Sequence, residues 1–364
     1  MATTSIQLIR TPEEITPPWL TDALRIDGTL GGDQRVERLH AVSLGDAAGL
    51  LGELYRVTIT YSAGAAGPSS LVIKLPSTDP QQRGVADALG FYKREITFYN
   101  DYAEGLPFAI PRSYGAVQAT DSTDFVLIME DVGHLHQIDQ VAGASLDQAR
   151  AAIATIARFH ARWWEHPELE VLGETFVPLS APIYRAALPG IFESGWATCK
   201  HKEQANLTPE VIEFADNYGS TLPFLLDELA TPATMVHGDF RGDNLLFDDD
   251  GGLSVLDFQI TGVANGVYDI AYFACQSIAT DVRRGNDDEL VRLYVDTLAT
   301  EGIELPLDLA TRKYRLATAF CLIYAVTSYQ AYDAFDGRQH QLMSSMLSRT
   351  VEAMIDNDSL SLIP

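Results

Sequence analysis

The chain has 364 residues, of which 46% are hydrophobic and 21% charged, and its formal net charge is −25. This composition is typical of a folded protein, and the length exceeds one typical domain, so we expect two lobes or two domains. The acidic excess argues against binding nucleic acid or an anionic membrane through a general electrostatic field; it is compatible with cationic ligands, with Mg²⁺ or simply with a solvated acidic surface.

Cysteine content and local hydropathy bear on the compartment. Cys199, Cys275 and Cys321 lie far apart and form no CxxC pair, which predicts no zinc site and a reducing compartment. The first residues lack an apolar stretch flanked by positive charge, and no apolar run approaches the roughly 18 residues of a membrane span. We therefore expect a cytoplasmic, soluble protein with no membrane partner.

The first part of the chain is predicted to be mostly strand. Segments rich in β-branched and apolar residues are bounded by turn residues, and residues 85–103 carry apolar side chains at helical intervals. The resulting order is β-β-β-α-β-β. The expected strands span residues 36–44, 54–62, 69–76, 111–119 and 124–132.

After about residue 133 the pattern becomes helical. Ser145 and Gln148 form a plausible capping box, and Thr208-Pro209-Glu210 has the features of a helix start. A small strand-rich lobe followed by a large helical lobe, an α+β fold, is the expected architecture. Strands are expected at 233–237, 244–248 and 253–258, and long helical stretches at 267–280, 287–300 and 308–332.

The segment MVHGDFRGDNLLFDDDGGLSVLDFQ, residues 235–259, places polar residues on short connections between strands. Asp239 and Asn244 are five residues apart, and Asp257 follows Asn244 by thirteen. A hairpin around FDDDGG would bring Asn244 and Asp257 to one edge, where amide and carboxylate oxygens suit Mg²⁺. A plain polar hairpin whose side chains cap turns is the alternative, and Asp248–Asp250 are expected to form an exposed turn.

The pair HGDFRGDN and LDFQ resembles the catalytic core of the aminoglycoside phosphotransferase and choline kinase-like group, relatives of protein kinases. With YDIAYFA, it is most similar to the ecdysteroid kinase-like (CHK kinase-like) family and its bacterial relatives, over roughly residues 40–335. The resemblance implies a bilobal protein-kinase-like fold with a nucleotide-binding lobe at 1–132, a connector at 129–133 and a helical lobe at 133–364. The helical lobe would hold the catalytic loop and the acceptor site. ATP and Mg²⁺ are the implied cofactors.

The resemblance also implies roles for the motif residues. Asp239 would orient the attacking hydroxyl and accept its proton, while Asn244 and Asp257 would hold the metal. His237 would support the loop. Arg241 could meet phosphate oxygens or a substrate carboxylate, or it could pair with a nearby Asp.

In the first lobe, Lys74 of LVIKLP matches the ligand of the α- and β-phosphates. A buried ammonium needs a partner, and the resemblance implies that this partner is a Glu on the following helix. Glu95 is the expected one, because Glu104 lies beyond the helix pattern. Snorkelling of Lys74 and an exposed Glu95 are the alternatives.

Two further segments match the nucleotide site. The loop SLGDAAGLLGELYRV lies where a phosphate-covering turn is expected, although a plain hairpin is possible. LIMEDVG matches the connector, where backbone groups of Glu130 and Val132 would meet adenine and Met129 would line the wall behind it. The glycines of the covering loop are Gly45, Gly49 and Gly52.

The expected substrate is a small-molecule alcohol. Gln259 replaces the usual Gly after DF, and no long activation segment separates it from Asp269, so no protein substrate is expected. Asp269, by resemblance, would hold the catalytic loop through its backbone amides. Aromatic residues of the second lobe could hold a quaternary ammonium or line an apolar pocket, or simply belong to the core. We rank a fairly apolar alcohol above choline or ethanolamine, and these above an aminoglycoside; a nucleotide-binding pseudokinase is a further alternative.

Overall fold

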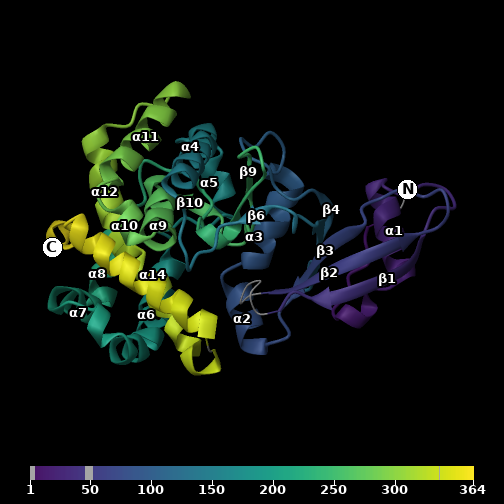
Figure 1. Ribbon diagram of the computed structural model, residues 1–364, viewed down its shortest axis with the longest axis horizontal. Helices are drawn as coiled ribbons and strands as arrows, with labels where there is room; N and C mark the ends of the chain where they lie inside the picture. The colour runs from purple at the N-terminus through teal and green to yellow at the C-terminus, as the bar shows by residue number, and fades with distance from the viewer. Residues whose placement is uncertain (1–4, 46–51, 336) are drawn as a thin grey trace. The chain divides into compact units, whose positions relative to one another are not determined.

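The computed structural model describes residues 5–45, 52–335 and 337–364. The chain forms two compact units. The first, here the sheet unit, comprises Met1–Gly105 and Ala109–Leu135, and the second, here the helical unit, comprises Leu106–Phe108 and His136–Pro364. Each unit has its own set of secondary-structure elements (Figure 1).

The strands of the sheet unit that the structure describes form one antiparallel sheet, and they occupy the five segments that the sequence predicts. Their spatial order is β1 (Val36–Ser43), β2 (Gly52–Tyr61), β3 (Ser70–Pro76), β5 (Phe125–Glu130) and β4 (Ser113–Gln118). The helices are α1 (Pro17–Asp27), α2 (Pro80–Ala88) and α3 (Phe91–Thr97), and a short π-helix, η3 (Phe98–Tyr102), continues α3.

The packing of β3 shows on which face of the sheet the Lys74 side chain lies. Leu71 and Ile73 of β3 are fully buried in a cluster with Leu20 and Leu24 of α1. Because successive strand residues point to opposite faces, Lys74 lies on the sheet face away from this cluster.

The helix predicted over 85–103 is interrupted. α2 ends at Ala88, and Gly90, with a φ of +68°, precedes α3. This left-handed conformation is one that glycine adopts without strain, so the chain turns there before the second helix begins.

The helical unit contains more elements than the sequence predicts. The capping box at Ser145–Gln148 and the helix start at Thr208 are confirmed. The stretch 308–332, however, is divided at Cys321 into separate helices. The helices are α4 (Leu146–Trp163), α5 (Leu169–Leu172), α6 (Pro182–Lys202), α7 (Pro209–Asp216), α8 (Tyr218–Glu228), α9 (Val267–Ser277), α10 (Thr280–Arg283), α11 (Asp287–Thr300), α12 (Leu307–Phe320), α13 (Leu322–Thr327) and α14 (Gly337–Asp356).

The strands of this unit carry the motif segment. The hairpin around FDDDGG is confirmed, and its Asp248–Asp250 turn is exposed. One sheet consists of β6 (His136–Gln137), β8 (Leu245–Phe247) and β9 (Leu253–Val255), and another pairs β7 (Thr234–Val236) with β10 (Gly262–Ala264).

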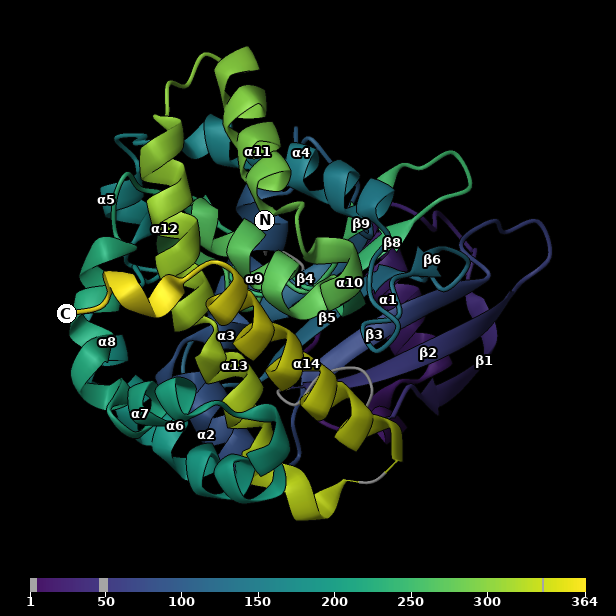
Figure 2. The same ribbon diagram turned by 60° about the vertical axis from the view of Figure 1, so that its left-hand side comes forward.

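Helix α9 lies inside the helical unit, with α4, α12 and α14 packed against it (Figure 2). All of its residues are buried. A helix that is covered all round can direct polar side chains only into other parts of the protein.

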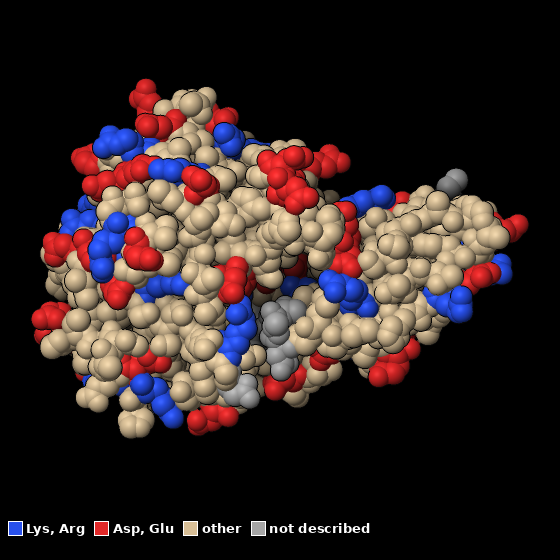
Figure 3. All heavy atoms as spheres, viewed as in Figure 1, with Lys and Arg blue, Asp and Glu red and all other residues tan. Residues whose placement is uncertain are grey.

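At the surface, acidic and basic side chains are interspersed on the face drawn in Figure 3. All three cysteines are buried free thiols. Among the described helices, none combines the length and the hydropathy that a membrane crossing requires.

Candidate active site

In the sheet unit, Lys74 of β3 and Glu95 of α3 form a buried ion pair. Lys74 Nζ lies 2.9 Å from Glu95 Oε1 and 2.7 Å from Oε2, and the two side chains retain only 7% and 2% of their exposure. Lys74 therefore does not snorkel to the surface, and Glu95 is not an exposed helix residue. Burial of both charges requires this mutual pairing, because either one left alone would be costly.

The glycine segment is described in part. Gly49 lies outside the described residues. Gly45 has a φ of +74°, which favours glycine. Gly52 opens β2, and a Cβ at this position would lie 3.1 Å from Lys74 Cε. The absence of a side chain at Gly52 thus lets the β2 backbone approach Lys74 closely.

The connector segment, residues 129–133, begins in the last two residues of β5 within the sheet unit. Met129 is 9% exposed. The N–H of Glu130 donates to the carbonyl of Arg112 at 2.9 Å, and the carbonyl of Val132 accepts from the N–H of Leu135, also at 2.9 Å. One backbone group of each predicted adenine-contacting residue is therefore already engaged within the sheet unit.

In the helical unit, Asp269 anchors the HGD segment that follows β7. Its Oδ2 accepts from the N–H of His237 at 2.7 Å, and its Oδ1 accepts from the N–H of Gly238 at 3.0 Å. His160 Nε2 lies 3.1 Å from Oδ2. The predicted role of Asp269 in holding the loop by backbone amides is confirmed. Because Asp269 is fully buried, these donors replace the water that would otherwise solvate its carboxylate.

The His237 ring bonds through both nitrogens. Its Nδ1 accepts from the N–H of Asp239 at 3.2 Å, and its Nε2 lies 2.9 Å from the carbonyl of Leu256. Since Nδ1 is the acceptor, we place the proton on Nε2, which donates to Leu256. The ring thus joins the loop to the residue before Asp257.

The Asp239 carboxylate is buried and receives hydrogen bonds on both oxygens. Tyr272 Oη donates to Oδ1 at 2.9 Å, and Asn244 Nδ2 donates to Oδ2 at 2.9 Å. Burial by itself raises the pKa of Asp239. The adjacent Arg241 charge and the donated hydrogen bonds outweigh burial, so the net pKa is lowered. Asp239 is therefore held as a carboxylate that can accept a proton.

Asn244 and Asp257 are brought together by the hairpin. The register pairs Leu245 with Val255, and the next backbone bond runs from the N–H of Leu256 to the carbonyl of Asn244 at 2.9 Å. Asn244 Nδ2 donates to the Asp239 carbonyl as well as to its side chain, both at 2.9 Å, which orients the amide oxygen away from Asp239. Asp257 has a φ of +64°, an uncommon conformation for a residue with a side chain.

The Arg241 guanidinium pairs with neighbouring carboxylates. Its Nε lies 3.2 Å from Asp239 Oδ1, and its Nη1 lies 2.7 Å from Asp243 Oδ2. Burial disfavours the charge on Arg241, but these carboxylates and Asp257 outweigh burial and raise its pKa. Of the two predicted alternatives, the structure contains the pairing with nearby Asp residues.

Helix α9 makes further hydrogen bonds to the loop that the sequence motif does not predict. Besides Asp269 and Tyr272, Tyr268 Oη donates to the carbonyl of Gly238 at 2.7 Å, and Ser277 Oγ accepts from the N–H of Gly242 at 2.8 Å. Tyr272 follows Tyr268 by four residues and Asp269 by three, about one helical turn, so one face of α9 holds the loop.

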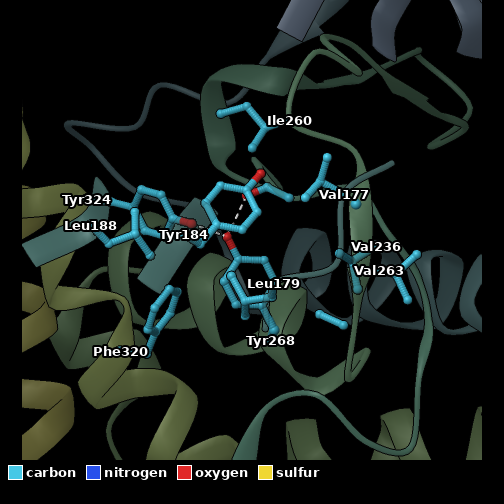
Figure 4. Close-up of a pocket in the computed structure, with 13 residues that line it drawn as sticks. Val177, Leu179, Tyr184, Leu188, Val236, Ile260, Val263, Tyr268, Phe320 and Tyr324 are labelled. Carbon is cyan, nitrogen blue, oxygen red and sulfur yellow. Dashed lines mark hydrogen bonds between the residues drawn. The ribbon is translucent and has the colours of Figure 1, made fainter. Parts of the chain in front are cut away.

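A pocket in the helical unit adjoins this loop. Gly238, which precedes Asp239, belongs to its lining, and the tyrosine rings gather there with aliphatic side chains (Figure 4). Every lining residue is aliphatic, aromatic or glycine. The lining consists of Val177, Leu179, Tyr184, Leu188, Val236, Gly238, Ile260, Gly262, Val263, Ala264, Tyr268, Phe320 and Tyr324.

The residues predicted to act together thus lie in two clusters, one in each unit. Lys74 and Glu95 form a pair in the sheet unit, and the helical unit joins Asp239 to Asn244 and Arg241 directly. Among the described residues, no three His, Cys, Asp or Glu side chains form a metal-binding cluster. One amide and one carboxylate do not complete the coordination of a magnesium ion. In sites that bind magnesium with a nucleotide, phosphate oxygens usually supply further ligands.

Comparisons with known proteins agree on the fold. The model of the ecdysteroid kinase-like family matches residues 47–305. A choline kinase from Cryptosporidium parvum Iowa II has a TM-score of 0.56 at 12% identity, covering 89% of this chain and 90% of the other. The GDP complex of wild-type aminoglycoside 2'-phosphotransferase-IIIa has a TM-score of 0.51 at 18% identity, covering 88% and 94%. At these identities the structural likeness establishes the fold alone. A search of curated proteins found no match.

Proposed function

The chain belongs to the ecdysteroid kinase-like family, and on that premise we propose that it transfers the γ-phosphate of ATP to a hydroxyl of a small molecule. One observation carries the proposal. The buried, ionised Asp239 lies on a loop anchored by α9, is bonded to Asn244 and directly follows a residue that lines an apolar pocket. These features support Asp239 as the residue that orients a bound alcohol for in-line attack.

Asp239 is the proposed base. Its carboxylate would accept a hydrogen bond from the acceptor hydroxyl and take that proton as the new oxygen–phosphorus bond forms. The bond from the γ-phosphorus to the bridging oxygen breaks, and ADP leaves with the electron pair. Because phosphoryl transfer needs mainly positioning and charge stabilisation, the fixed loop is as important here as the basicity of Asp239.

The residues present fit a magnesium ion. The amide oxygen of Asn244 is turned away from Asp239 by the two bonds of its nitrogen. Asn244 directly precedes β8, and Asp257 follows β9, the strand that pairs with β8. Both supply hard oxygens, which Mg²⁺ prefers. Asn244 and Asp257 would hold the ion, and when bound it would supply neutralisation of phosphate charge.

The sheet unit is proposed to serve the nucleotide. Lys74, held by Glu95, would contact the α- and β-phosphates, and Gly45 and Gly49 belong to the loop proposed to cover them. Met129, Glu130 and Val132 are the proposed contacts of the base. We regard the ion pairs of Arg241 as favouring a structural role for that residue over contact with phosphate.

The acceptor is proposed to be a fairly apolar alcohol that occupies the pocket beside Gly238. Aliphatic and aromatic lining suits such a molecule. An amino alcohol such as choline is the second candidate, because its ammonium group could make cation–π contacts with the four aromatic rings of the lining. These rings belong to Tyr184, Tyr268, Phe320 and Tyr324. An aminoglycoside carries several ammonium groups and would need carboxylates at its site, so we rank it last.

The central test uses Asp239→Asn. We expect turnover of Mg·ATP with any accepted alcohol to fall by more than about a hundredfold, because the variant loses a proton acceptor used in the transition state. Binding of Mg·ATP, followed by the rise in Tm, should be largely retained. An unchanged kcat would overturn the role of Asp239, and an equal loss of nucleotide binding would count against a purely catalytic role.

The acceptor is found by incubating the protein with Mg·ATP and a panel of terpenoid and sterol-like alcohols, choline, ethanolamine and kanamycin. Mass spectrometry would detect the gain of one phosphoryl group. Phosphorylation of the apolar alcohols first would support the ranking above. Nucleotide binding without turnover of any panel member or of water would favour the pseudokinase alternative.

A further inference from the structure

Three tyrosines of the helical unit connect the apolar pocket to the catalytic loop. Tyr268 and Tyr324 line the pocket (Figure 4), and their hydroxyl groups are hydrogen-bonded to each other. Tyr272, one turn further along α9, stacks on the ring of Tyr324 with a centroid distance of 4.4 Å and an interplanar angle of 15°. From this cluster, Tyr268 bonds the Gly238 carbonyl and Tyr272 bonds Asp239.

The Asp239 carboxylate is fixed by donors on opposite oxygens. Tyr272 holds Oδ1 and Asn244 holds Oδ2, each at 2.9 Å. A rotation of the carboxylate plane would break both bonds. The hydroxyl of Tyr272 is itself fixed, because its side chain is 97% buried, leaving 3% exposed, and its ring lies against Tyr324.

Arg241 provides a competing partner for the same carboxylate. Its Nε lies 3.2 Å from Asp239 Oδ1 and 3.3 Å from Oδ2, at nearly equal distance from both oxygens. Without the Tyr272 bond, Oδ1 would keep only the guanidinium of these partners, while Asn244 would still hold Oδ2. The carboxylate could then turn about the Asn244 bond and draw Oδ1 closer to Arg241, since Arg pairs strongly with carboxylates. Oδ1 would leave the position that an incoming hydroxyl needs.

We propose that Tyr272 is a positioning residue for the phosphotransfer reaction, holding the Asp239 carboxylate in the plane that an acceptor hydroxyl needs. Tyr324 supports it from the pocket side through the ring stack. An acceptor in the pocket thus lies against the ring that backs Tyr272. This inference rests on the proposed function, since it presupposes that Asp239 is the base.

Tyr272→Phe tests the proposal because it removes one oxygen atom and retains the stacked ring. Turnover of Mg·ATP with water as the acceptor provides a probe that needs no identified alcohol. We expect kcat to fall about tenfold, in keeping with the cost of a small misplacement of a catalytic group. The KM for ATP and the Tm shift caused by Mg·ATP should stay within about twofold of wild type, because the hydroxyl affects only the reacting carboxylate.

Tyr314→Phe is the matched control. Tyr314 is 1% exposed and donates to Asp287 Oδ1 at 2.6 Å, so it is also a buried tyrosine on a carboxylate, but outside the loop and the pocket. We expect it to lower Tm as Tyr272→Phe does while leaving kcat unchanged. Equal kcat values for the two variants would overturn the proposal.

Asp239→Asn separates failure of this inference from failure of the proposed function. If Asp239→Asn retains turnover, the proposed function falls. If it loses turnover while Tyr272→Phe does not, only the inference falls. Should Tyr272→Phe fail to fold, Tyr324→Leu removes the stack and leaves the Tyr272 hydroxyl; we expect kcat to fall by about threefold at an unchanged KM for ATP, and an unchanged kcat would contradict the inference.

Discussion

At the scale of single residues, Asp269 shows how one carboxylate can fix a catalytic loop. Its two oxygens accept the N–H groups of His237 and Gly238, and the same carboxylate lies 3.1 Å from His160 Nε2. All four residues except Gly238 are fully buried side chains, with no exposure. Water cannot replace any of these bonds, so their loss leaves buried donors unsatisfied.

We therefore predict that Asp269→Asn lowers the free energy of unfolding of the helical unit by roughly 3 kcal/mol, because the amide NH₂ faces a backbone donor that needs an acceptor. The kcat should fall as well, since the loop that carries Asp239 loses an anchor. Urea unfolding and steady-state kinetics measure the two effects. Asp288→Asn removes an exposed carboxylate from the first turn of α11. As the control for helix-dipole effects, it should lower stability by no more than about 1 kcal/mol and leave kcat unchanged.

The sequence predicted this site unevenly at the residue scale. Asp239, Asn244 and Asp269 could be found because the segments HGDFRGDN and YDIAYFA resemble the motifs of a known kinase group. Tyr272 carries an equally direct bond to Asp239, but an aromatic residue in an apolar segment is indistinguishable from core by type. The feature of the sequence that could identify Tyr272 is its spacing from Asp269. It follows Asp269 by three residues, which places both side chains on one face of a helix.

At the scale of elements, local signals succeeded where they were strong. The starts of α1 and α7 share a threonine that caps through its side chain and a proline in the first turn, Thr16-Pro17 and Thr208-Pro209. Only the start of α7 also has an acidic residue in its first turn, and only α7 is among the elements predicted from the sequence. The division of residues 308–332 at Cys321 has no local signal. It follows from packing, because Tyr218 Oη donates to the carbonyl of Phe320 at that point.

Helices α6 and α13 approach closely at a glycine, and both contribute to the pocket. A Cβ on Gly195 would lie 2.2 Å from the carbonyl oxygen of Val326. Tyr184 and Leu188 line the pocket from α6, and Tyr324 lines it from α13. The spacing of the two helices therefore sets the width of the pocket at this side.

We predict that Gly195→Ala separates these helices and costs about 1–3 kcal/mol in stability, the usual range for overpacking. The KM for the acceptor should rise while the KM for ATP stays unchanged. Gly190→Ala lies on the same helix with no atom within 4 Å of its Cβ, and it should be neutral or slightly stabilising. If the two variants have the same acceptor KM, the packing of α6 on α13 does not set acceptor binding.

At the scale of the whole molecule, each unit forms by itself one of the residue pairs on which the proposed function depends. The Lys74–Glu95 pair is complete within the sheet unit, and the Asp239–Asn244 pair within the helical unit. The resemblance to kinase motifs predicted the residues of both pairs, whereas the bond between Asp239 and Asn244 appears only in the structure. The overall charge of −25 contributed less to predicting the site, because a net charge does not say where the charged side chains lie.

If both units bind one Mg·ATP, substitutions in either should weaken the same stabilisation. Mg²⁺ alone should leave Tm unchanged, because Asn244 and Asp257 form an incomplete ligand set. Mg·ATP at about a hundred times its Kd should stabilise the protein by about 2.7 kcal/mol, and EDTA should remove most of that gain. Lys74→Met and Asp257→Asn should each reduce the shift, measured by differential scanning calorimetry against each variant's own ligand-free Tm.

Two matched substitutions make this comparison decisive. Lys313, 7% exposed, pairs with Glu228 at 3.1 Å, so Lys313→Met removes a buried lysine from an ion pair outside the proposed site. Asp248→Asn changes an exposed carboxylate of the hairpin turn. Both should retain the full Mg·ATP shift even where the ligand-free Tm falls. If Lys74→Met keeps as much of the shift as Lys313→Met, the sheet unit takes no part in binding the phosphates, because loss of the ammonium must weaken any site that uses it.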